Sequence, residues 1–285
     1  LFANTTGTRN TAVGKDALKL NTTGNENTSF GNFSLDANTT GCKNNAFGDS
    51  SLSANTTGCC NVAIGNATLS SNTTAIYNTA VGINALTTST TGTSNSAVGA
   101  LSLDAATTGS YNSGMGYGSL GANTTGAFNA SIGYAAGSNV TTGSSNIAIG
   151  KSSGTDAVFN ITTESNRLVL GHNNISNAYI KVALTVTSDL RDKTEIGDVP
   201  HGLDFVDKLK PVSFKFKKSR ENDTPHGFKK YGFLAQDILE LEGSDNVIID
   251  NENEENLKLT NSHLIPVLVN AIKELKAEID ELKKK

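Results

Sequence analysis

A glycine recurs every 17 residues through the first half of this chain, and this fixed period limits the folds that the chain can adopt. One series follows a Thr-Thr pair and is replaced once, by Ala75. A second series keeps the same spacing through nine copies without an insertion. Such strict repetition is typical of a solenoid, in which each repeat buries its surface against the next. The second series is Gly14, Gly31, Gly48, Gly65, Gly82, Gly99, Gly116, Gly133 and Gly150.

The residues between the glycines predict strands and turns. Each copy approximates N-T-T-G-x-x-N-x-A-V-G-x-x-(A/S)-L-x-x, with runs that are too short for helices and rich in β-branched residues. We therefore predict a mainly β N-terminal half, with one β-solenoid or β-roll coil per 17 residues over residues 1–154. A triple β-helix wound from three chains is the alternative.

A large apolar residue stands directly before each glycine of the second series, and a small residue stands directly before the large one. These two positions form a large series and a small series along the repeats. Because neighbouring strand residues point to opposite faces, only one of the two series can face the core. We interpret the large series as core, together with leucines such as Leu18, and the small series as an outward face. Only nine charged residues occur among the first 150, so we expect this face to associate laterally with another chain. The large series is Val13, Phe30, Phe47, Ile64, Val81, Val98, Met115, Ile132 and Ile149.

Two other residue types stand out in the repeats. An Asn holds a fixed place in every copy, as at Asn27 and Asn44, and we interpret it as a structural ladder or turn residue. The odd number of cysteines (Cys42, Cys59 and Cys60) and the lack of CxxC pairs argue against a zinc site or a disulfide framework. We expect no cofactor and no metal.

The regular period ends near Asp156, and residues 155–187 are predicted to form a β stem or connector. Strand-like segments occur at Arg167–Leu170 and Tyr179–Val186. Beyond Ser188 the composition becomes that of a globular α+β domain. The spacing of apolar residues predicts a helix over 203–209, a strand over 212–216, a charged loop over 217–230, a helix from Ala235 and a short strand over 246–249.

The C-terminal segment 264–285 carries a coiled-coil seam of about three heptads. Its apolar residues alternate spacings of three and four, between Lys and Glu. Ile at a and Leu at d favours two strands, so the seam predicts association without fixing its stoichiometry. The seam residues are Ile265, Leu268, Ile272, Leu275, Ile279 and Leu282.

The stretch VTSDLRDKTEI places Ser188 five residues before Lys193, at the border between the two compositions. A serine hydroxyl needs a base to remove its proton, and a lysine serves only when its pKa falls from about 10.4 towards neutrality. Taken alone, a Ser and a Lys at this spacing are equally compatible with a polar linker. His201, His226 and His263 form no Ser-His-Asp pattern with it.

The motifs SDLRDKTEI, GLDFVDKLKPVSFKFK and YGFLAQDILELE, followed by the coiled coil, resemble the C-terminal intramolecular chaperone domain of viral and phage tail fibres and spikes. This family is also called the endosialidase chaperone or S74 peptidase. The resemblance covers Thr187 to Lys285. The repeat motifs NVAIG and NIAIG resemble the β-roll heads of trimeric autotransporter adhesins, which trimerise side by side.

The resemblance implies a homotrimer in which residues 188–285 help to fold the preceding fibre and then release themselves. The cut would fall between Thr187 and Ser188, with Ser188 as nucleophile and Lys193 as general base. Asp189, Arg191 and Asp192 would support them. The implied enzyme is a single-turnover serine autoprotease acting in cis.

The same resemblance implies a virion location, assembly in the host cytoplasm, and binding of the mature part to a host-surface glycan or protein. A net charge of −4 without a basic patch argues against nucleic acid, and no apolar run is long enough to insert into a membrane. Carboxylates in the repeats are too sparse to nominate a glycosidase pair. The alternative function is a surface adhesin whose C-terminal domain trimerises without cleaving.

Overall fold

The computed structural model divides into two compact units, Leu1–Ile175 and Ser176–Lys285. The structure describes residues 1–156, 159–172, 174–175, 178–181, 188–220, 222–243 and 246–284. The predicted strand Tyr179–Val186 lies mostly outside these residues, as does Thr187. The boundaries predicted at 154 and 187 stay predictions.

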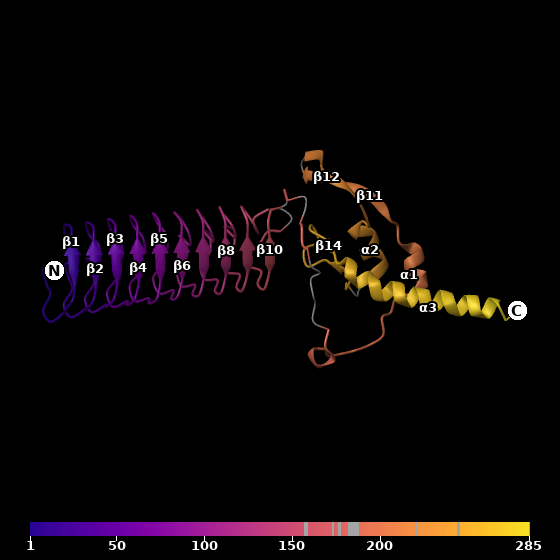
Figure 1. Ribbon diagram of the computed structural model, residues 1–285, viewed down its shortest axis with the longest axis horizontal. Helices are drawn as coiled ribbons and strands as arrows, with labels where there is room; N and C mark the ends of the chain where they lie inside the picture. The colour runs from indigo at the N-terminus through magenta and orange to yellow at the C-terminus, as the bar shows by residue number, and fades with distance from the viewer. Residues whose placement is uncertain are drawn as a thin grey trace. The chain divides into compact units, whose positions relative to one another are not determined.

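The N-terminal unit is a β-solenoid of stacked coils, each contributing one short strand to a parallel sheet (Figure 1). Neighbouring strands pair in register at the 17-residue period, as in Ala46 with Ala63. Both partners come from one chain, so the triple β-helix alternative is wrong. The strands are β1 (Thr11–Val13), β2 (Thr28–Phe30), β3 (Asn45–Phe47), β4 (Val62–Ile64), β5 (Thr79–Val81), β6 (Ser96–Val98), β7 (Ser113–Met115), β8 (Ala130–Ile132), β9 (Ile147–Ile149) and β10 (Leu168–Leu170).

The sheet continues into the segment predicted as connector. The last strand, β10, pairs with β9 in the register of Leu168 with Ile147, a spacing of 21 residues. The four extra residues are accommodated between the strands, and the stacking of the coils persists. The strand-like character read at Arg167–Leu170 therefore belongs to the solenoid sheet.

The prediction of which ladder faces the core is wrong. The small residues point inward and are fully buried, as at Ala46 and Ala63, whereas Phe30 is 55% exposed. Leucines such as Leu52 and Leu69 fill the interior with the alanines in one continuous core. A three-residue strand in so short a coil leaves a narrow interior. Ala or Ser facing Leu fills that space, and the large residues of each strand are left outside.

Asparagines form buried ladders along the solenoid, which confirms their structural interpretation. The backbone N–H of Asn44 donates to Oδ1 of Asn27 at 3.0 Å, and its Nδ2 donates to the carbonyl of Gly58 at 2.8 Å. Glycine is required beside these ladders by close approach, because a Cβ on Gly41 would lie 2.4 Å from the Gly58 carbonyl oxygen. The repeated Asn and Gly thus stabilise the turns of the coils.

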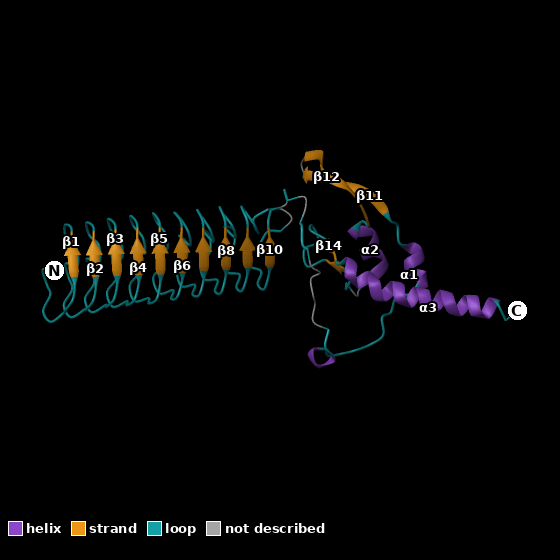
Figure 2. Ribbon diagram, in the orientation of Figure 1, coloured by secondary structure: helices purple, strands orange, loops and turns teal. Residues whose placement is uncertain are grey.

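The C-terminal unit is a small α+β fold that ends in a long helix (Figure 2). The antiparallel hairpin of β11 and β12 occupies most of the segment predicted as a charged loop, so that prediction is wrong. Charge does not exclude a strand whose side chains are largely exposed, as they are in β12. The elements are a 3-10 helix (Leu190–Asp192), α1 (Leu203–Lys208), β11 (Val212–Ser219), β12 (Asn222–Gly232), α2 (Ala235–Glu242), β13 (Ile249–Asp250), β14 (Lys258–Leu259), a second 3-10 helix (Asn261–His263) and α3 (Leu264–Leu282).

A compact core joins α1, α2, β13 and the first turns of α3. Phe205, Ile238, Ile249 and Val267 are buried in this core, which anchors the beginning of α3. Glu274, farther along α3, accepts a hydrogen bond from the backbone N–H of Leu203 at 2.6 Å and so ties α3 to the beginning of α1. The predicted helices at 203–209 and 264–285 are confirmed within a few residues of their ends.

Candidate functional site

Ser188 and Lys193 are brought together by a single turn of 3-10 helix. Asp189 caps this turn, because its Oδ1 accepts the backbone N–H of Arg191 at 2.9 Å. The backbone N–H of Lys193 closes the turn on the carbonyl of Leu190 at 3.2 Å. The chain thereby reverses, and the Nζ of Lys193 donates to the Oγ of Ser188 at 2.8 Å.

Arg191 and Asp189 hold the shape of this turn. The Nη2 of Arg191 lies 2.6 Å from Oδ2 of Asp189, and its Nε lies 3.0 Å from Oδ1, which makes a two-pronged ion pair. The hydrogen bonds from Arg191 lower the pKa of the Asp189 carboxyl below its usual value. Because both residues are exposed, the pair orders the turn locally and does not depend on burial.

The structure thus brings together four of the predicted site residues, Ser188, Asp189, Arg191 and Lys193. Asp192 lies in the same turn, where its backbone N–H donates to the Asp189 carbonyl at 3.1 Å. Its predicted support of Lys193 stays a prediction. Thr187, the predicted residue on the other side of the cut, lies outside the described residues.

The turn is open to solvent in this single chain. Residues 188–200 are all exposed, and the apolar side chain of Leu190 is 70% exposed. Among the residues that the structure describes, none besides Lys193 forms a hydrogen bond with the Ser188 hydroxyl, and none supplies an oxyanion-binding pair of N–H groups beside it. A nucleophile and a basic side chain are in contact here, but the surface that would enclose a reacting carbonyl is not provided by the turn.

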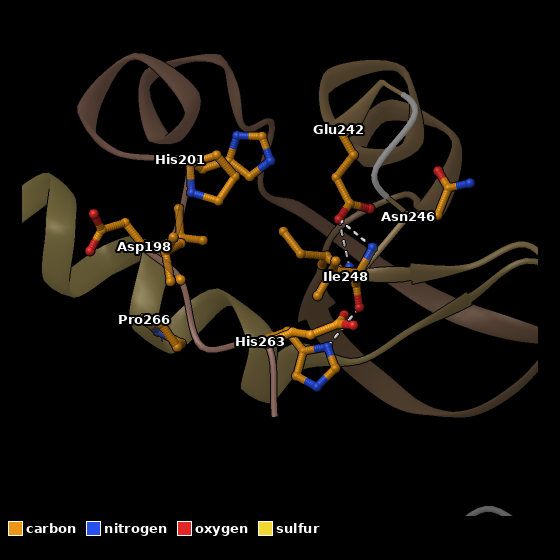
Figure 3. Close-up of a pocket in the computed structure, with 13 residues that line it drawn as sticks. Asp198, His201, Glu242, Asn246, Ile248, His263 and Pro266 are labelled. Carbon is orange, nitrogen blue, oxygen red and sulfur yellow. Dashed lines mark hydrogen bonds between the residues drawn. The ribbon is translucent and has the colours of Figure 1, made fainter. Parts of the chain in front are cut away.

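A pocket in the same unit is lined by the segment 195–201, by the end of α2 with residues 246–248, and by the beginning of α3 (Figure 3). Two of its polar side chains, Glu242 and His263, are engaged in structural contacts. The carboxylate of Glu242 accepts the backbone N–H groups of Val247, Ile248 and Ile249 at 2.9, 2.6 and 2.9 Å. The Nδ1 of His263 donates to the Val247 carbonyl at 2.6 Å. The sequence analysis missed Glu242, because a Glu near the end of an amphipathic helix gives no signal of such a role.

His201 and His226 also take no part in the Ser188 turn. The ring of His201 stacks on Phe205 with centroids 4.3 Å apart, and His226 belongs to β12, paired with Phe216. The reading that the histidines form no Ser-His-Asp arrangement agrees with these positions. None of the helices in the described parts of the chain is long and apolar enough to cross a membrane.

A comparison with family models matches residues 188–247 to Peptidase_S74, chaperone of endosialidase. The match begins at Ser188, the first residue of the turn, and ends at Val247, before α3. Searches of the curated proteins and of the solved structures gave no match.

This family implies a role in folding and trimerising a fibre or spike, and a self-cleaving, serine-type peptidase activity at a coarse level. The β-solenoid that precedes the domain fits a tail-fibre-like repeat segment. The C-terminal unit of this chain therefore carries, over residues 188–247, a chaperone-of-endosialidase domain of the Peptidase_S74 family.

Proposed function

We propose that this chain is a segment of a viral tail fibre or spike, in which residues 188–285 assemble the β-solenoid as a homotrimer and then release it by autoproteolysis. The cut lies between Thr187 and Ser188. The observation that carries this proposal is the 2.8 Å contact between Lys193 Nζ and Ser188 Oγ, at the first residue of the family match.

The proposed reaction begins with Ser188 attacking the peptide bond before it. Lys193, as the neutral amine, takes the hydroxyl proton, and Oγ bonds to the carbonyl carbon of Thr187 through a five-membered ring. The C–N bond then breaks, and the proton passes from Lys193 to the new α-amine of Ser188. Water hydrolyses the ester that results, which leaves a carboxylate on Thr187 and restores the serine. One chain turns over once.

Assembly supplies a reason for the cleavage to wait until folding is complete. The Ser188 turn is exposed in the single chain, and a lysine becomes a better base when it is desolvated or lies near another cation. A neighbouring subunit packed on the turn would do both and would contribute the missing oxyanion donors. We therefore propose that the active site is completed only in the trimer.

The exposed stripe of α3 supports association at the C-terminus. The apolar side chains of the predicted seam are 42–68% exposed, while Leu264, Val267 and Ala271 on another side of the helix are buried. An apolar stripe left uncovered along a helix indicates a partner that buries it. We assign the stripe to the same helix in two other copies, in parallel.

The outward face of the solenoid sheet supports association of the repeats. Parallel sheets are normally covered on both faces, yet this face exposes Phe30, Ile64 and Ile132 by 42–55%. None of strands β1 to β9 contains a charged residue. Three copies held in parallel by α3 would present identical uncharged ladders to one another. The large apolar ladder, and not the small one, is therefore the proposed lateral interface.

The released part would attach the virion to a host-surface glycan or protein. The support for this step is the fit of the β-solenoid to tail-fibre-like repeats. Its assembly would take place in the host cytoplasm. A trimeric adhesin that keeps its C-terminal unit is the competing function, and the cleavage experiment separates the two.

The test compares the wild-type chain of residues 1–285 with Ser188→Ala and Lys193→Arg. Denatured intact masses are followed over time after expression. The proposal expects fragments 1–187 and 188–285 from the wild type, and uncut chains from both variants, with all three proteins trimeric. A wild-type chain that stays whole while trimeric would contradict self-release and leave the competing adhesin.

A further inference from the structure

Two of the three cysteines stack on one another in neighbouring coils of the solenoid. Cys42 and Cys59 are one 17-residue period apart, and their Sγ atoms lie 2.7 Å from each other. Both are free thiols and partly exposed. Their spacing equals the repeat period, which places the two side chains at the same position in adjacent coils. The number of cysteines and the absence of a CxxC motif do not reveal this proximity.

The backbone around the pair is held in place by the solenoid. The N–H of Cys60 donates to the Cys42 carbonyl at 2.9 Å, and the N–H of Cys42 lies 3.0 Å from Cys59 Sγ. Adjacent strands of a sheet are about 4.8 Å apart, within the range of about 4.4–6.8 Å between Cα atoms that a disulfide spans. A covalent bond between the sulfurs therefore needs no rearrangement of the coils.

We propose that Cys42 and Cys59 form a disulfide that joins two neighbouring coils when the folded chain meets a soluble disulfide oxidant such as oxidised glutathione. Cys60 is left as the free thiol. This inference does not depend on the proposed cleavage or on the identity of the fibre.

The chemistry proceeds in two exchanges. The thiolate of Cys59 attacks one sulfur of oxidised glutathione, which forms a mixed disulfide and releases one glutathione. The sulfur of Cys42 then loses its proton to water and attacks Cys59 Sγ, which expels the second glutathione. Two electrons pass from the two cysteines to the oxidant, and the two protons end on the two glutathione thiols.

The hydrogen bond between the thiols indicates the order of these exchanges. It is the largest cause that raises the pKa of Cys42 to about 11, so Cys42 holds its proton while both thiols are free. Capping of Cys59 removes this hydrogen bond. Without this hydrogen bond Cys42 loses its proton more easily and can attack the mixed disulfide. Cys42 therefore acts second, as the resolving thiol.

Other coils provide a matched control for the thiols. At the same place in the repeat, the N–H of Thr93 donates to Ser110 Oγ at 3.0 Å, and that of Ala127 donates to Ser144 Oγ at 3.0 Å. A serine at position 59 can therefore accept the N–H of residue 42 as Cys59 Sγ does. Cys59→Ser and Cys42→Ser should preserve the fold.

The folded full chain is treated with oxidised glutathione and then denatured in the presence of an alkylating reagent. Mass spectrometry counts the alkylated thiols. We expect one alkylated cysteine in the oxidised wild type and three after reduction. Without reduction, a tryptic digest should join the peptide ending at Lys43 to the one beginning at Asn44. Cys60→Ser should keep this link, and Cys59→Ser should lose it.

Three results would overturn the inference: three free thiols after oxidation, a link that persists in Cys59→Ser, or a link between chains and not within one. Circular dichroism of each serine variant verifies that loss of the link is not loss of the fold. A wild-type spectrum in Cys59→Ser together with no link supports the assigned pair.

Discussion

Asn72 and Ser89 occupy the same place in neighbouring coils, yet the Oδ1 of Asn72 and the Oγ of Ser89 are both buried without a hydrogen-bond partner among the residues that the structure describes. In the preceding coils the ladder is continuous, as in Asn72 Nδ2 to Asn55 Oδ1 at 2.7 Å. The serine side chain is too short to donate to Asn72 Oδ1, and the residue one period later is Ala106, which has no polar side chain. The ladder is interrupted there.

Restoring the ladder should stabilise the solenoid. In Ser89→Asn, the new Nδ2 should donate to Asn72 Oδ1, and adding Ala106→Asn should extend the ladder to Asn123. We expect the double variant to gain about 1–2 kcal/mol in free energy of unfolding, from about 1 kcal/mol per net hydrogen bond. Urea denaturation followed by circular dichroism measures this. Asn55→Ala, which breaks the intact ladder, should lose about 1–3 kcal/mol. A double variant less stable than wild type would show that the gap has another cause.

Asp36 and Asp104 stand four periods apart at one place in the repeat, where Ser53 and Ser70 stand in coils between them. Burial raises the pKa of each carboxyl above its ordinary value. The folded chain therefore binds these protons more tightly than the unfolded chain. Tighter proton binding stabilises the folded chain below the unfolded pKa of about 4. This stabilisation is lost as the pH rises through the folded pKa.

Replacement of both acids by serine should remove that pH dependence. The variant should be more stable than wild type at pH 7, and the difference should shrink or reverse at pH 4. Thermal unfolding of both proteins across this range measures the effect. An advantage of the same size at both pH values would assign the effect to packing and not to titration.

The Asp189–Arg191 ion pair should position the cleavage site without reacting. Arg191→Ala should slow the cut by about 10-fold or more, because the turn that places Lys193 on Ser188 loses its brace. Arg191→Lys, which can make one charged hydrogen bond to Asp189 in place of two, should cleave at a rate between those of Arg191→Ala and the wild type. Intact mass against time gives the rates. Lys208→Ala, an exposed basic residue on α1, is the control and should cleave at the wild-type rate.

The seam of α3 should be required for assembly. Ile272 is 66% exposed in the single chain, so Ile272→Asp costs the monomer little and places a charge in the proposed trimer seam. We expect the trimer to be lost and cleavage to fall with it. Sedimentation analysis measures the first and intact mass the second. Lys273→Asp, one position along the helix, should stay trimeric; equal loss in both variants would argue against the seam.

The large apolar ladder on the outward face of the sheet should hold the three solenoids together after release. In Ile64→Asp, a charge replaces a member of the large apolar ladder, and fragment 1–187 should dissociate into monomers after cleavage. Thr57→Asp introduces the same charge at an exposed turn position and should leave the fragment trimeric. Native mass spectrometry distinguishes the two. A trimeric fragment from Ile64→Asp would place the interface elsewhere on the coil.

The period, the strands and the C-terminal helix follow from the sequence because each rests on spacing. Strict recurrence of Gly and Asn requires stacking in register, and the apolar spacing of Ile265 to Leu282 requires a helix. The inward and outward faces do not follow from spacing. Alternation says that Ala46 and Phe47 face opposite ways, but the narrow interior decides which is buried, and that width is a property of the closed coil.

The local geometry of the candidate site could be predicted from the sequence, but its surroundings could not. The Ser188–Lys193 contact spans one turn, so a motif of six residues contains nearly all of its geometry. The Cys42–Cys59 contact could be found only by counting in repeat periods. In the proposed trimer a second chain encloses Ser188, and neither the motif nor the single chain specifies those contacts.

The most direct test of the account is the assembly state of residues 1–187 prepared in two ways. One sample is the fragment released from the wild-type chain of residues 1–285, and the other is the same fragment expressed alone. If residues 188–285 are a folding and trimerising chaperone, native mass spectrometry will show a trimer in the first sample and monomers or aggregates in the second. An identical trimer in both samples would contradict the chaperone role, even if the chain cleaves itself.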